Sequence, residues 1–510
     1  MAQGILPFQY EIEKTPSGMT ALAGLPAYLD LSAVSGLTAS IQKHMMVCAE
    51  KTQGWTDAQI VMPLILLNLA GGECVNDLRI LEGDEGFVRV LRRVELKSLG
   101  LPRKERRKLE RRWRKEKRRA IPSSSPVFRY LAAFHDKDEE DKRKIGKAFI
   151  PAPNDNLQGL RFVNRDLVGF AQQKSPHTTA TLDMDATLAA THKKGALFSY
   201  KGFKAYQPLN TYWFEHEMIL HSEFRDGNVP AGYQQLRVFK NSLHDLPDGV
   251  ENVFLRSDTA GYQWDLMRYC AEGANERFGV IGFAIGADVT PEFKRAVAEI
   301  EDNDWHPFIR EVGGKQVETG QEWAEVCFVP NGVGFKKNGP EYRYLAIREP
   351  LKQPELPGME EEQKQLPFPT MKFSQTRYKL FGVVTNRNLP GQELIEWHRE
   401  RCGKSEEVHS VMKADLAGGK LPSGDFGDNA AWWGIMILAL NLNALMRQLV
   451  LPKEWSTKRL KAIRFGLINV AGRVMKRARQ LFIRLSGSHP FADLLIDIRG
   501  RIMTLAQAPP

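Results

Sequence analysis

The sequence predicts a protein of mixed α and β structure, in the α/β or α+β class, with helical regions at both ends. Apolar residues recur at helical spacing over residues 1–95 and again beyond Pro390. Between these regions, two segments rich in β-branched residues end in aspartate, and residues 278–385 contain further short apolar runs typical of strands. Because a single hydrophobic core stops growing at about 250–300 residues, the 510 residues are expected to form several domains.

The first predicted domain comprises residues 1–150 and is mostly helical. Its clearest helix is the apolar run 58–69, which Thr56 or Asp57 caps and which Gly71-Gly72 ends. The composition then becomes charged and poor in aromatic residues, which indicates a different kind of segment at the end of this domain.

The positive charge of the chain is concentrated in residues 103–119. This segment contains twelve Lys/Arg and three Glu, a net charge of +9, whereas the whole chain carries +10. Because so many cations in one stretch would release counterions from DNA phosphates, we expect a helical arm or flexible insert that binds DNA. Trp113 is a candidate to stack on bases or to wedge between them. The alternative is a charged insert without a partner. The candidate DNA-binding residues here are Arg106, Arg107, Arg111, Arg112 and Arg114.

Two predicted strands end in acidic residues. In the segment 177–187, the two-residue period of a strand places Asp183 and Asp185 on one face. The apolar segment 252–258 ends in Asp258, and a turn follows it. Open sheets place their active sites at the carboxyl ends of strands, so these carboxylates are candidate catalytic residues. The alternative for any single aspartate is a turn or a helix cap.

The rest of the chain is predicted to complete a core and to add strands and helices. The uncharged run 429–446 is long enough to span a bilayer, but its three asparagines favour a buried core helix. C-terminal helices are expected at 393–413, 429–450 and 457–485. The predicted domains after the first are 151–277 (first part of the core), 278–385 (a β-rich insertion) and 386–510 (last part of the core with C-terminal helices).

A third candidate acid lies on the helix predicted at 393–413. Glu406 and Lys413 are seven residues apart, which is two turns of an α-helix, and so lie on one face. This pairing would direct a carboxylate and a phosphate-binding cation into one cleft. Phosphodiester transfer uses two metal ions about 4 Å apart, and Mg²⁺ is held by a few carboxylates from different elements.

These motifs resemble those of bacterial insertion-sequence transposases of the DDE type, named for three catalytic acids, which have an RNase H-like core. Within them, the chain is most similar to the IS1380 group of the IS4-like class. The resemblance includes Asp185-Ala-Thr187, Arg256-Ser-Asp258-Thr-Ala-Gly261, Tyr200 to Leu209, Arg225-Asp-Gly-Asn228, the late helix with Arg, Glu and Lys, and Leu421 to Trp432.

The resemblance implies roles for the candidate residues. Asp185, Asp258 and Glu406 would be the catalytic ligands of Mg²⁺ or Mn²⁺, and Asp183 is a further candidate ligand. The cations around Glu406 that would contact transposon-end DNA are Arg401, Lys404 and Lys413.

The spacing of the acids fits this resemblance in part. Asp258 follows Asp185 by 73 residues and precedes Glu406 by 148, which leaves room for a β-rich insertion. Relatives carry Arg four residues before the Glu, whereas Arg401 lies five before Glu406. Glu407 therefore stays an alternative ligand, and the position of the usual Tyr is taken by Trp397 or His398.

Several other functions have no support in the sequence. The ATP-binding pattern GxxxxGK[ST], the dinucleotide pattern GxGxxG and the hydrolase pattern GxSxG do not occur. His216 and His221 are five residues apart, one more than a zinc-binding HExxH helix allows. The five cysteines include no CxxC pair and the first residues contain no secretory signal, so we expect the bacterial cytoplasm, in association with the nucleoid.

The expected reaction is cut-and-paste transposition: Mg²⁺-dependent cleavage at inverted-repeat ends, followed by strand transfer to target DNA. The expected partner is double-stranded DNA, both transposon ends and target, bound by a homodimer without membrane or nucleotide cofactor. Two alternatives share these features: an inactive DNA-binding relative that represses transposon ends, and a nuclease of the same fold without strand transfer. Intact acids at all three positions argue against the inactive relative.

Overall fold

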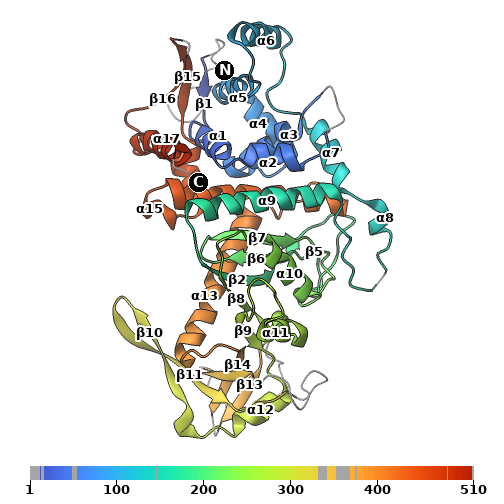
Figure 1. Cartoon of the computed structure of the whole chain (residues 1–510), viewed down its shortest axis with the longest axis vertical. Helices are drawn as coiled ribbons and strands as arrows, with labels where there is room; N and C mark the ends of the chain where they lie inside the picture. Colours follow the sequence, from blue (N-terminus) through green and yellow to red (C-terminus); the bar gives the residue numbers. More distant parts are fainter. Residues whose placement is uncertain are drawn as a thin grey trace, which may run out of the picture. The chain divides into compact units, whose positions relative to one another are not determined.

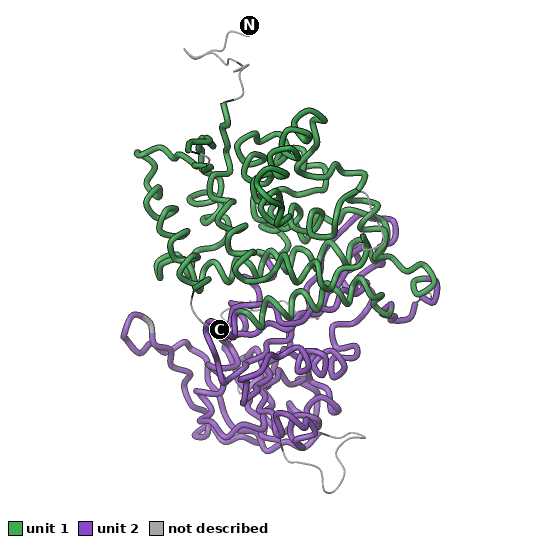
Figure 2. The backbone as a smooth tube through the Cα atoms, turned by 45° about the horizontal axis from the view of Figure 1, so that its top comes forward, with its two compact units in different colours: residues 1–140, 152–170, 411–510 green, residues 141–151, 171–410 purple. Residues whose placement is uncertain are grey.

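The computed structural model confirms a mixed α/β protein with a large mixed sheet (Figure 1). It describes residues 12, 17–48, 54–144, 146–330, 342–351, 368–373, 376–478 and 480–507. The chain divides into two compact units (Figure 2): unit 1 comprises residues 1–140, 152–170 and 411–510, and unit 2 comprises residues 141–151 and 171–410.

Unit 1 is mainly helical and is assembled from three separated stretches of chain. Its N-terminal helices are α1 (Leu25–Val34), α2 (Leu37–His44), α3 (Asp57–Ala70), η1 (Val75–Asp77), α4 (Leu78–Gly83), α5 (Glu85–Ser98), α6 (Arg103–Lys115), α7 (Ser124–Leu131), η2 (Ala132–Phe134) and α8 (Lys137–Glu140). Most of α9 (Asp155–Lys174) follows. The C-terminal stretch adds η5 (Val411–Asp415), α14 (Phe426–Leu445), η6 (Met446–Val450), α15 (Lys453–Ser456), α16 (Leu460–Ile463), η7 (Arg464–Ile468) and α17 (Ala492–Gln507).

The first apolar helix begins and ends as the sequence predicts. At the start of α3, the Thr56 hydroxyl accepts from the Gln59 backbone N–H while the Gln59 side chain accepts from the Thr56 N–H, which forms a capping box. At its end, Gly71 has the left-handed conformation, with φ of 96°, that glycine adopts without strain.

Helix α14 is the core of unit 1 and confirms the buried helix expected at 429–450. Its asparagines make buried hydrogen bonds: Asn443 accepts from the Tyr28 hydroxyl at 2.8 Å, and Asn441 donates to Asn164 at 2.7 Å. By length and composition Phe426–Val450 could cross a membrane, as could the bent pair Asp57–Ala70 with Val75–Gly83. In the first of these, 78% of the apolar window is buried inside the protein, as in a core helix.

The segment 457–485, expected to be helical, is helical over α16 and η7 and then forms a β-hairpin. β15 (Gly472–Arg477) pairs with β16 (Gln480–Leu485), and β15 also pairs with β1 (Met19–Thr20), so the three strands form a small sheet in the order β1-β15-β16. The helix prediction was confirmed over 460–468 and was wrong for the two strands, because β1, which pairs with β15, lies more than 450 residues away in the sequence, where local periodicity cannot reveal it.

The basic segment 103–119 is a packed helix, not a flexible insert. Trp113 on α6 is only 7% exposed, and the Arg118 guanidinium lies 4.2 Å from its ring centroid. Arg118 in turn pairs with Glu95 of α5 at 3.0 Å. The expectation that Trp113 stacks on bases was therefore wrong, because its ring is buried within unit 1.

Unit 2 contains a ten-stranded sheet. Its order is β10-β11-β12-β14-β9-β8-β2-β6-β7, with β13 paired to β14. The strands are β2 (Thr179–Ala186), β6 (Leu209–Trp213), β7 (Met218–Glu223), β8 (Asn252–Ser257), β9 (Gly282–Ala287), β10 (His306–Val312), β11 (Lys315–Val326), β12 (Arg343–Pro350), β13 (Thr370–Phe373) and β14 (Thr376–Thr385). β2, β8 and β9 run parallel, and the other pairs are antiparallel.

The strands that the sequence predicts to end in acids are confirmed as β2 and β8, neighbours in this sheet. Strand β9, from the segment 278–385, pairs directly with β8, so the sheet continues without a break into that segment. The remaining elements of unit 2 are β3 (Ala189–Ala190), β4 (Leu197–Phe198), β5 (Lys204–Tyr206), α10 (Gln235–Asp245), η3 (Thr259–Gly261), α11 (Trp264–Ala271), α12 (Pro291–Ala298), η4 (Asp302–Asp304) and α13 (Gly391–Ser410).

Helices cover both faces of the sheet. On β6, Asn210 contacts His409 of α13, whereas the next residue, Thr211, accepts from Ser242 of α10 at 2.8 Å. Because consecutive residues of a strand point to opposite faces, α13 and α10 lie on opposite sides. The start of α13 is fixed by an apolar cluster in which Leu394 and Ile395 pack on residues of β9, β10, β12 and β14.

Candidate active site

Two carboxylates lie at the carboxyl ends of adjacent parallel strands. In the register of β2 and β8, Met184 is opposite Ser257, so Asp185 and Asp258 are the next residues of the two strands. Neighbouring strands lie about 4.8 Å apart, so the two side chains share one edge of the sheet. This is the place at which the sequence predicts the acids, and it is where open sheets hold their active sites.

The turn after β8 holds Asp258 in place. Its carboxylate accepts from the Ala260 N–H at 3.0 Å and caps the short helix η3. Two glycines make the tight turn possible. A Cβ on Gly261 would lie 2.5 Å from the Ser257 hydroxyl, and one on Gly286 of β9 would lie 3.1 Å from the Thr259 nitrogen. Small residues at both places let the chain turn closely over the sheet edge.

Asp185 faces two side chains of α13. Its Oδ2 lies 3.4 Å from Arg401 Nη1 and 3.9 Å from His409 Nδ1. Burial raises the pKa of Asp185 to about 6; Arg401 lowers the pKa and the negative charge of Asp258 raises it further. Asp258 acts on this pKa because the two carboxylates lie at the same edge of the sheet.

Asn210 orients His409. The Asn210 side chain and His409 Nε2 are 3.2 Å apart, and Asn210 Oδ1 accepts from the Ser222 hydroxyl at 2.7 Å. With its oxygen occupied, Asn210 presents its amide N–H to Nε2, so the proton of neutral His409 is on Nδ1, the atom that faces Asp185. Helix α13 thus donates a hydrogen bond from Arg401 to Asp185 and places the His409 ring close to the same carboxylate oxygen.

Asp183 has a different environment from Asp185. Both of its oxygens are bound by Arg256, Oδ1 by Nε at 2.6 Å and Oδ2 by Nη2 at 2.9 Å. Arg256 is fully buried and also donates to the Trp397 carbonyl and to Glu400. Arg256 thus connects β2, β8 and α13, so its salt bridge with Asp183 has a structural role next to the two catalytic candidates.

The third sequence-predicted acid is on α13, on the border of its buried face. Both Glu406 and Glu407 are exposed. At 100° per residue, Glu406 is about 60° around the helix from His409, whereas Glu407 is about 160° away, on the far side. Within the described ranges, no group of three His, Cys, Asp or Glu side chains is placed to hold a metal ion, so Glu406 does not join the two aspartates in this structure.

The predicted basic residues fall into two groups. In unit 2, Arg401 is 8% exposed beside Asp185, and Lys404 pairs with Glu217 at 3.2 Å. Lys413 lies in unit 1, in the π-helical turn η5, so the α-helical spacing that placed it with Glu406 applies only as far as Ser410. On α6 of unit 1, Arg107 and Arg111 are exposed and Arg106 is half-buried, while Arg112 and Arg114 pair with Glu116 and Glu110.

Sequence reasoning missed three residues of this site: His409, Asn210 and Arg256. His409 had a usable signal, because it lies eight residues after Arg401 and shares its helix face. Asn210 had none, because its contact with α13 depends on strand pairing. Arg256 stood inside a recognised motif, but its buried role beside Asp183 requires knowledge of the register between β2 and β8.

Comparison with known proteins gives one decisive match. No curated protein matches the chain. A cryo-EM structure of the piggyBac transposase synaptic complex with hairpin DNA is similar at a TM-score of 0.41 and 10% identity, over 94% of this chain and 80% of that one. The sequence model of the family described as "Transposase DDE domain group 1" matches residues 11–325 and 364–507, most of the chain. The chain therefore belongs to this family and is an enzyme, a DDE transposase.

Proposed function

We propose that the chain catalyses Mg²⁺-dependent cleavage at the inverted-repeat ends of a transposon and then transfers the freed 3′ hydroxyl to target DNA. The observation that carries this proposal is the juxtaposition of Asp185 and Asp258 at the ends of β2 and β8. Hydrolysis of the end releases free energy, and attack of the 3′ hydroxyl on target DNA breaks one phosphodiester bond as it forms another, so neither step requires a nucleotide cofactor.

The proposed catalytic core is RNase H-like and of the IS1380 group. Its strands would be β7-β6-β2-β8-β9, with α13 returning the chain to the core and the strands β10 to β14 as the insertion. Support comes from the parallel set β2, β8 and β9, which brings two acids to one edge, and from helices on both faces. The segments that resemble the IS1380 group, 185–187 and 256–261, lie at the carboxyl ends of β2 and β8.

Divalent-metal chemistry suits the residues at this edge. Carboxylate oxygens are hard donors of the kind that Mg²⁺ and Mn²⁺ prefer. The pKa of Asp185 stays raised at about 6 because Arg401 does not fully offset burial and the charge of Asp258, so a cation would supply further positive charge. We propose Asp185, Asp258 and Glu406 as the ligands. A bound cation would polarise the phosphate and lower the pKa of an attacking hydroxyl.

The residues around these ligands have supporting roles in the proposal. Arg401 and His409 orient Asp185, and Asp183 with Arg256 fixes the strand that carries it. Lys404, Lys413 and the cations of α6 would contact DNA phosphates of the transposon end and target. We further propose a homodimer that brings two ends together, acting in the bacterial cytoplasm at the nucleoid.

The test uses short duplexes that carry the terminal repeats of the host element. Wild-type chain with Mg²⁺ should nick the end and join it to a second duplex. Asp258→Ala should abolish both products yet retain binding, because phosphate contacts elsewhere supply most of the affinity. Asp248→Ala, which removes an exposed carboxylate of the same unit, is the matched control and should behave as wild type.

Each outcome of this test separates the alternatives. Cleavage without joining would identify a nuclease without strand transfer. Specific binding without any product, under Mg²⁺ and Mn²⁺ alike, would identify an inactive repressor. Retained cleavage by Asp258→Ala would overturn the proposed site.

A further inference from the structure

The hairpin β15–β16 (residues 472–485), named here the basic ribbon, carries a strong charge that its packing does not explain. The segment contains five Lys/Arg and no Asp or Glu. Arg473 and Arg484 are directly opposite each other in the antiparallel register. Like charges in such a pair destabilise a hairpin, so this arrangement favours an anionic partner.

The ribbon has one packed face and one open face. On the packed face, Val474 is 1% exposed, and its carbonyl accepts from Arg89 of α5 at 3.1 Å. The open face comprises the cross-strand pairs Arg473 with Arg484, Met475 with Phe482, and Arg477 with Gln480. Its arginines are exposed, and Phe482 is 45% exposed. The open face is therefore a twisted basic strip with one aromatic side chain in it.

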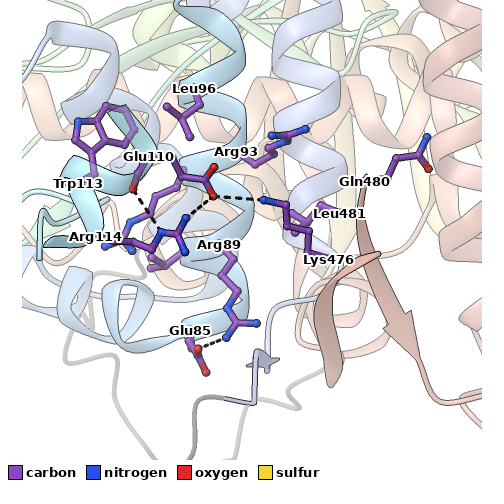
Figure 3. Close-up of a pocket in the computed structure, with 12 residues that line it drawn as sticks. Glu85, Arg89, Arg93, Leu96, Glu110, Trp113, Arg114, Lys476, Gln480 and Leu481 are labelled. Atoms are coloured by element: carbon purple, nitrogen blue, oxygen red, sulfur yellow. Dashed lines mark hydrogen bonds and ion pairs between the residues drawn. The ribbon is translucent and has the colours of Figure 1, made fainter. Parts of the chain in front are cut away.

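The basic ribbon and α6 flank the same cavity. The cavity has a volume of about 420 Å³ and is lined by residues of α5, α6 and the ribbon, including Arg89, Arg92, Arg93 and Arg114. Lys476 of the ribbon pairs with Glu110 of α6 at 3.6 Å, and Glu110 also pairs with Arg114 (Figure 3). The two most basic segments of unit 1, far apart in the sequence, are thus neighbours in space.

Helix α6 adds a second basic strip. Lys104, Lys108, Arg111 and Lys115 are all exposed and recur at intervals of three and four residues, so they lie along one face of the helix. Trp113 faces the other way, into unit 1. A helix with such a strip suits contact with a row of phosphates, without selection among bases.

We propose that the basic ribbon lies in the major groove of the transposon-end duplex and reads its sequence, while α6 holds the adjacent phosphates. This inference rests on the proposed function, since the duplex is the substrate of that reaction. The major groove of B-DNA admits a two-stranded β-ribbon, and arginine pairs with guanine through two hydrogen bonds. The ribbon thus supplies selection of the end, and α6 supplies sequence-independent affinity.

The experiment compares binding to a terminal-repeat duplex and to a scrambled duplex by fluorescence anisotropy, between 50 and 200 mM salt. For the variant Arg477→Ala/Arg484→Ala, we expect the preference for the terminal repeat to fall roughly tenfold or more. Lys104→Ala/Lys108→Ala should weaken binding to both duplexes equally and lower the slope of log affinity against log salt by about two, because two phosphate contacts are lost. The matched control, Arg268→Ala/Arg295→Ala, removes two exposed arginines of unit 2 that pair on their own helices.

The outcomes distinguish this inference from the proposed function. If wild-type chain shows no preference for the terminal repeat, the proposed function fails. If wild type shows the preference and Arg477→Ala/Arg484→Ala keeps it, only the ribbon inference is overturned. If light scattering shows that Arg477→Ala/Arg484→Ala changes the oligomeric state while the preference is kept, the ribbon inference is overturned, and β16 is instead a contact between two copies of the chain. Phe482→Ala, which keeps every charge, should reduce the preference without changing the salt slope, and an unchanged preference would exclude Phe482 from the contact.

Discussion

At the residue scale, two aspartates two positions apart on β2 have different partners, although burial raises the pKa of both. Asp183 is bound at both oxygens by a fully buried arginine, Arg256. Asp185 is buried beside Asp258, so that the pKa of Asp185 rises to about 6 and ionisation is unfavourable without added positive charge. The salt bridge of Asp183 stabilises the fold, whereas the raised pKa of Asp185 is typical of a residue in a functional site.

Alanine at these two positions should therefore separate stability from activity. Asp183→Ala leaves the Arg256 charge buried without its carboxylate, which should lower the free energy of unfolding by about 3–5 kcal/mol. Asp185→Ala removes a carboxylate whose charge is unfavourable there, so we expect wild-type stability or better, with no cleavage. Urea denaturation and the cleavage assay measure the two effects. Equal destabilisation by both variants would contradict this division of roles.

Asp226, in the loop after β7, is a second buried aspartate with a raised pKa, and it lies outside the proposed active site. It is fully buried, and burial raises its pKa to about 6 although Arg143 lies 3.3 Å away. Among the described residues, its carboxylate oxygens have no hydrogen-bond donor. The ionised form is therefore a cost to folding at neutral pH.

Asp226→Asn should stabilise the protein in a pH-dependent way. Because the folded pKa is raised, the contribution of Asp226 to stability is complete below its unfolded pKa near 3.8 and is lost as the pH rises through about 6. The advantage of the variant should therefore grow between pH 4 and 6 and level off above 7, at up to about 3 kcal/mol. Denaturant unfolding of both proteins across this range measures the difference. A difference that does not change with pH would mean that Asp226 does not titrate there.

At the element scale, α13 decides which acid completes the site. Its buried residues His398, Arg401, Ser405 and His409 follow helical spacing along the face that meets the sheet. Glu406 borders this face on the side of His409, and Glu407 lies on the far side of the helix. Glu406 is therefore the glutamate on the side of the helix that is nearer to His409, which lies beside Asp185.

The two glutamates provide a test of this geometry. Glu406→Ala should reduce cleavage to below about 1% of the wild-type rate, because losing a ligand disrupts the two-ion arrangement. Glu407→Ala, an equal loss of charge at an exposed neighbour, should retain most activity. Both variants should have the same midpoint denaturant concentration of unfolding as the wild type, since neither side chain is buried. Similar losses of cleavage in the two variants would contradict the prediction that the position on the helix face determines which glutamate is the metal ligand.

At the scale of the whole molecule, unit 1 depends on chain ends that are far apart in the sequence. The Tyr28 hydroxyl donates to Asn443 of α14, and Arg464 donates to the carbonyls of Asn68 and Leu69 at the end of α3. The C-terminal stretch therefore fills the core of the N-terminal helices, and β15 completes the sheet that β1 begins.

A chain cut after Ser410 should lose unit 1 and keep unit 2. Without α14, the buried face of α3 and the core residues around Tyr28 would be open to water. We expect rapid amide exchange and proteolysis over 17–140, with protection retained over 171–410, compared with the full chain. Protection of 17–140 in the shortened chain would show that the N-terminal helices fold without α14.

The sequence by itself determined the local features of this protein: the capped helix α3, the core helix α14, the strands β2 and β8, and the acids at their ends. These features depend on side-chain periodicity and on turn residues, both of which are determined by residues close together in the sequence. Only the tertiary structure showed that β8 pairs with β2, that Arg256 forms a salt bridge with Asp183, and that His409 lies beside Asp185. It also showed that the later part of the segment predicted as helix at 457–485 is a hairpin that lies beside α6, because strand pairing joins residues whose separation in sequence carries no local signal.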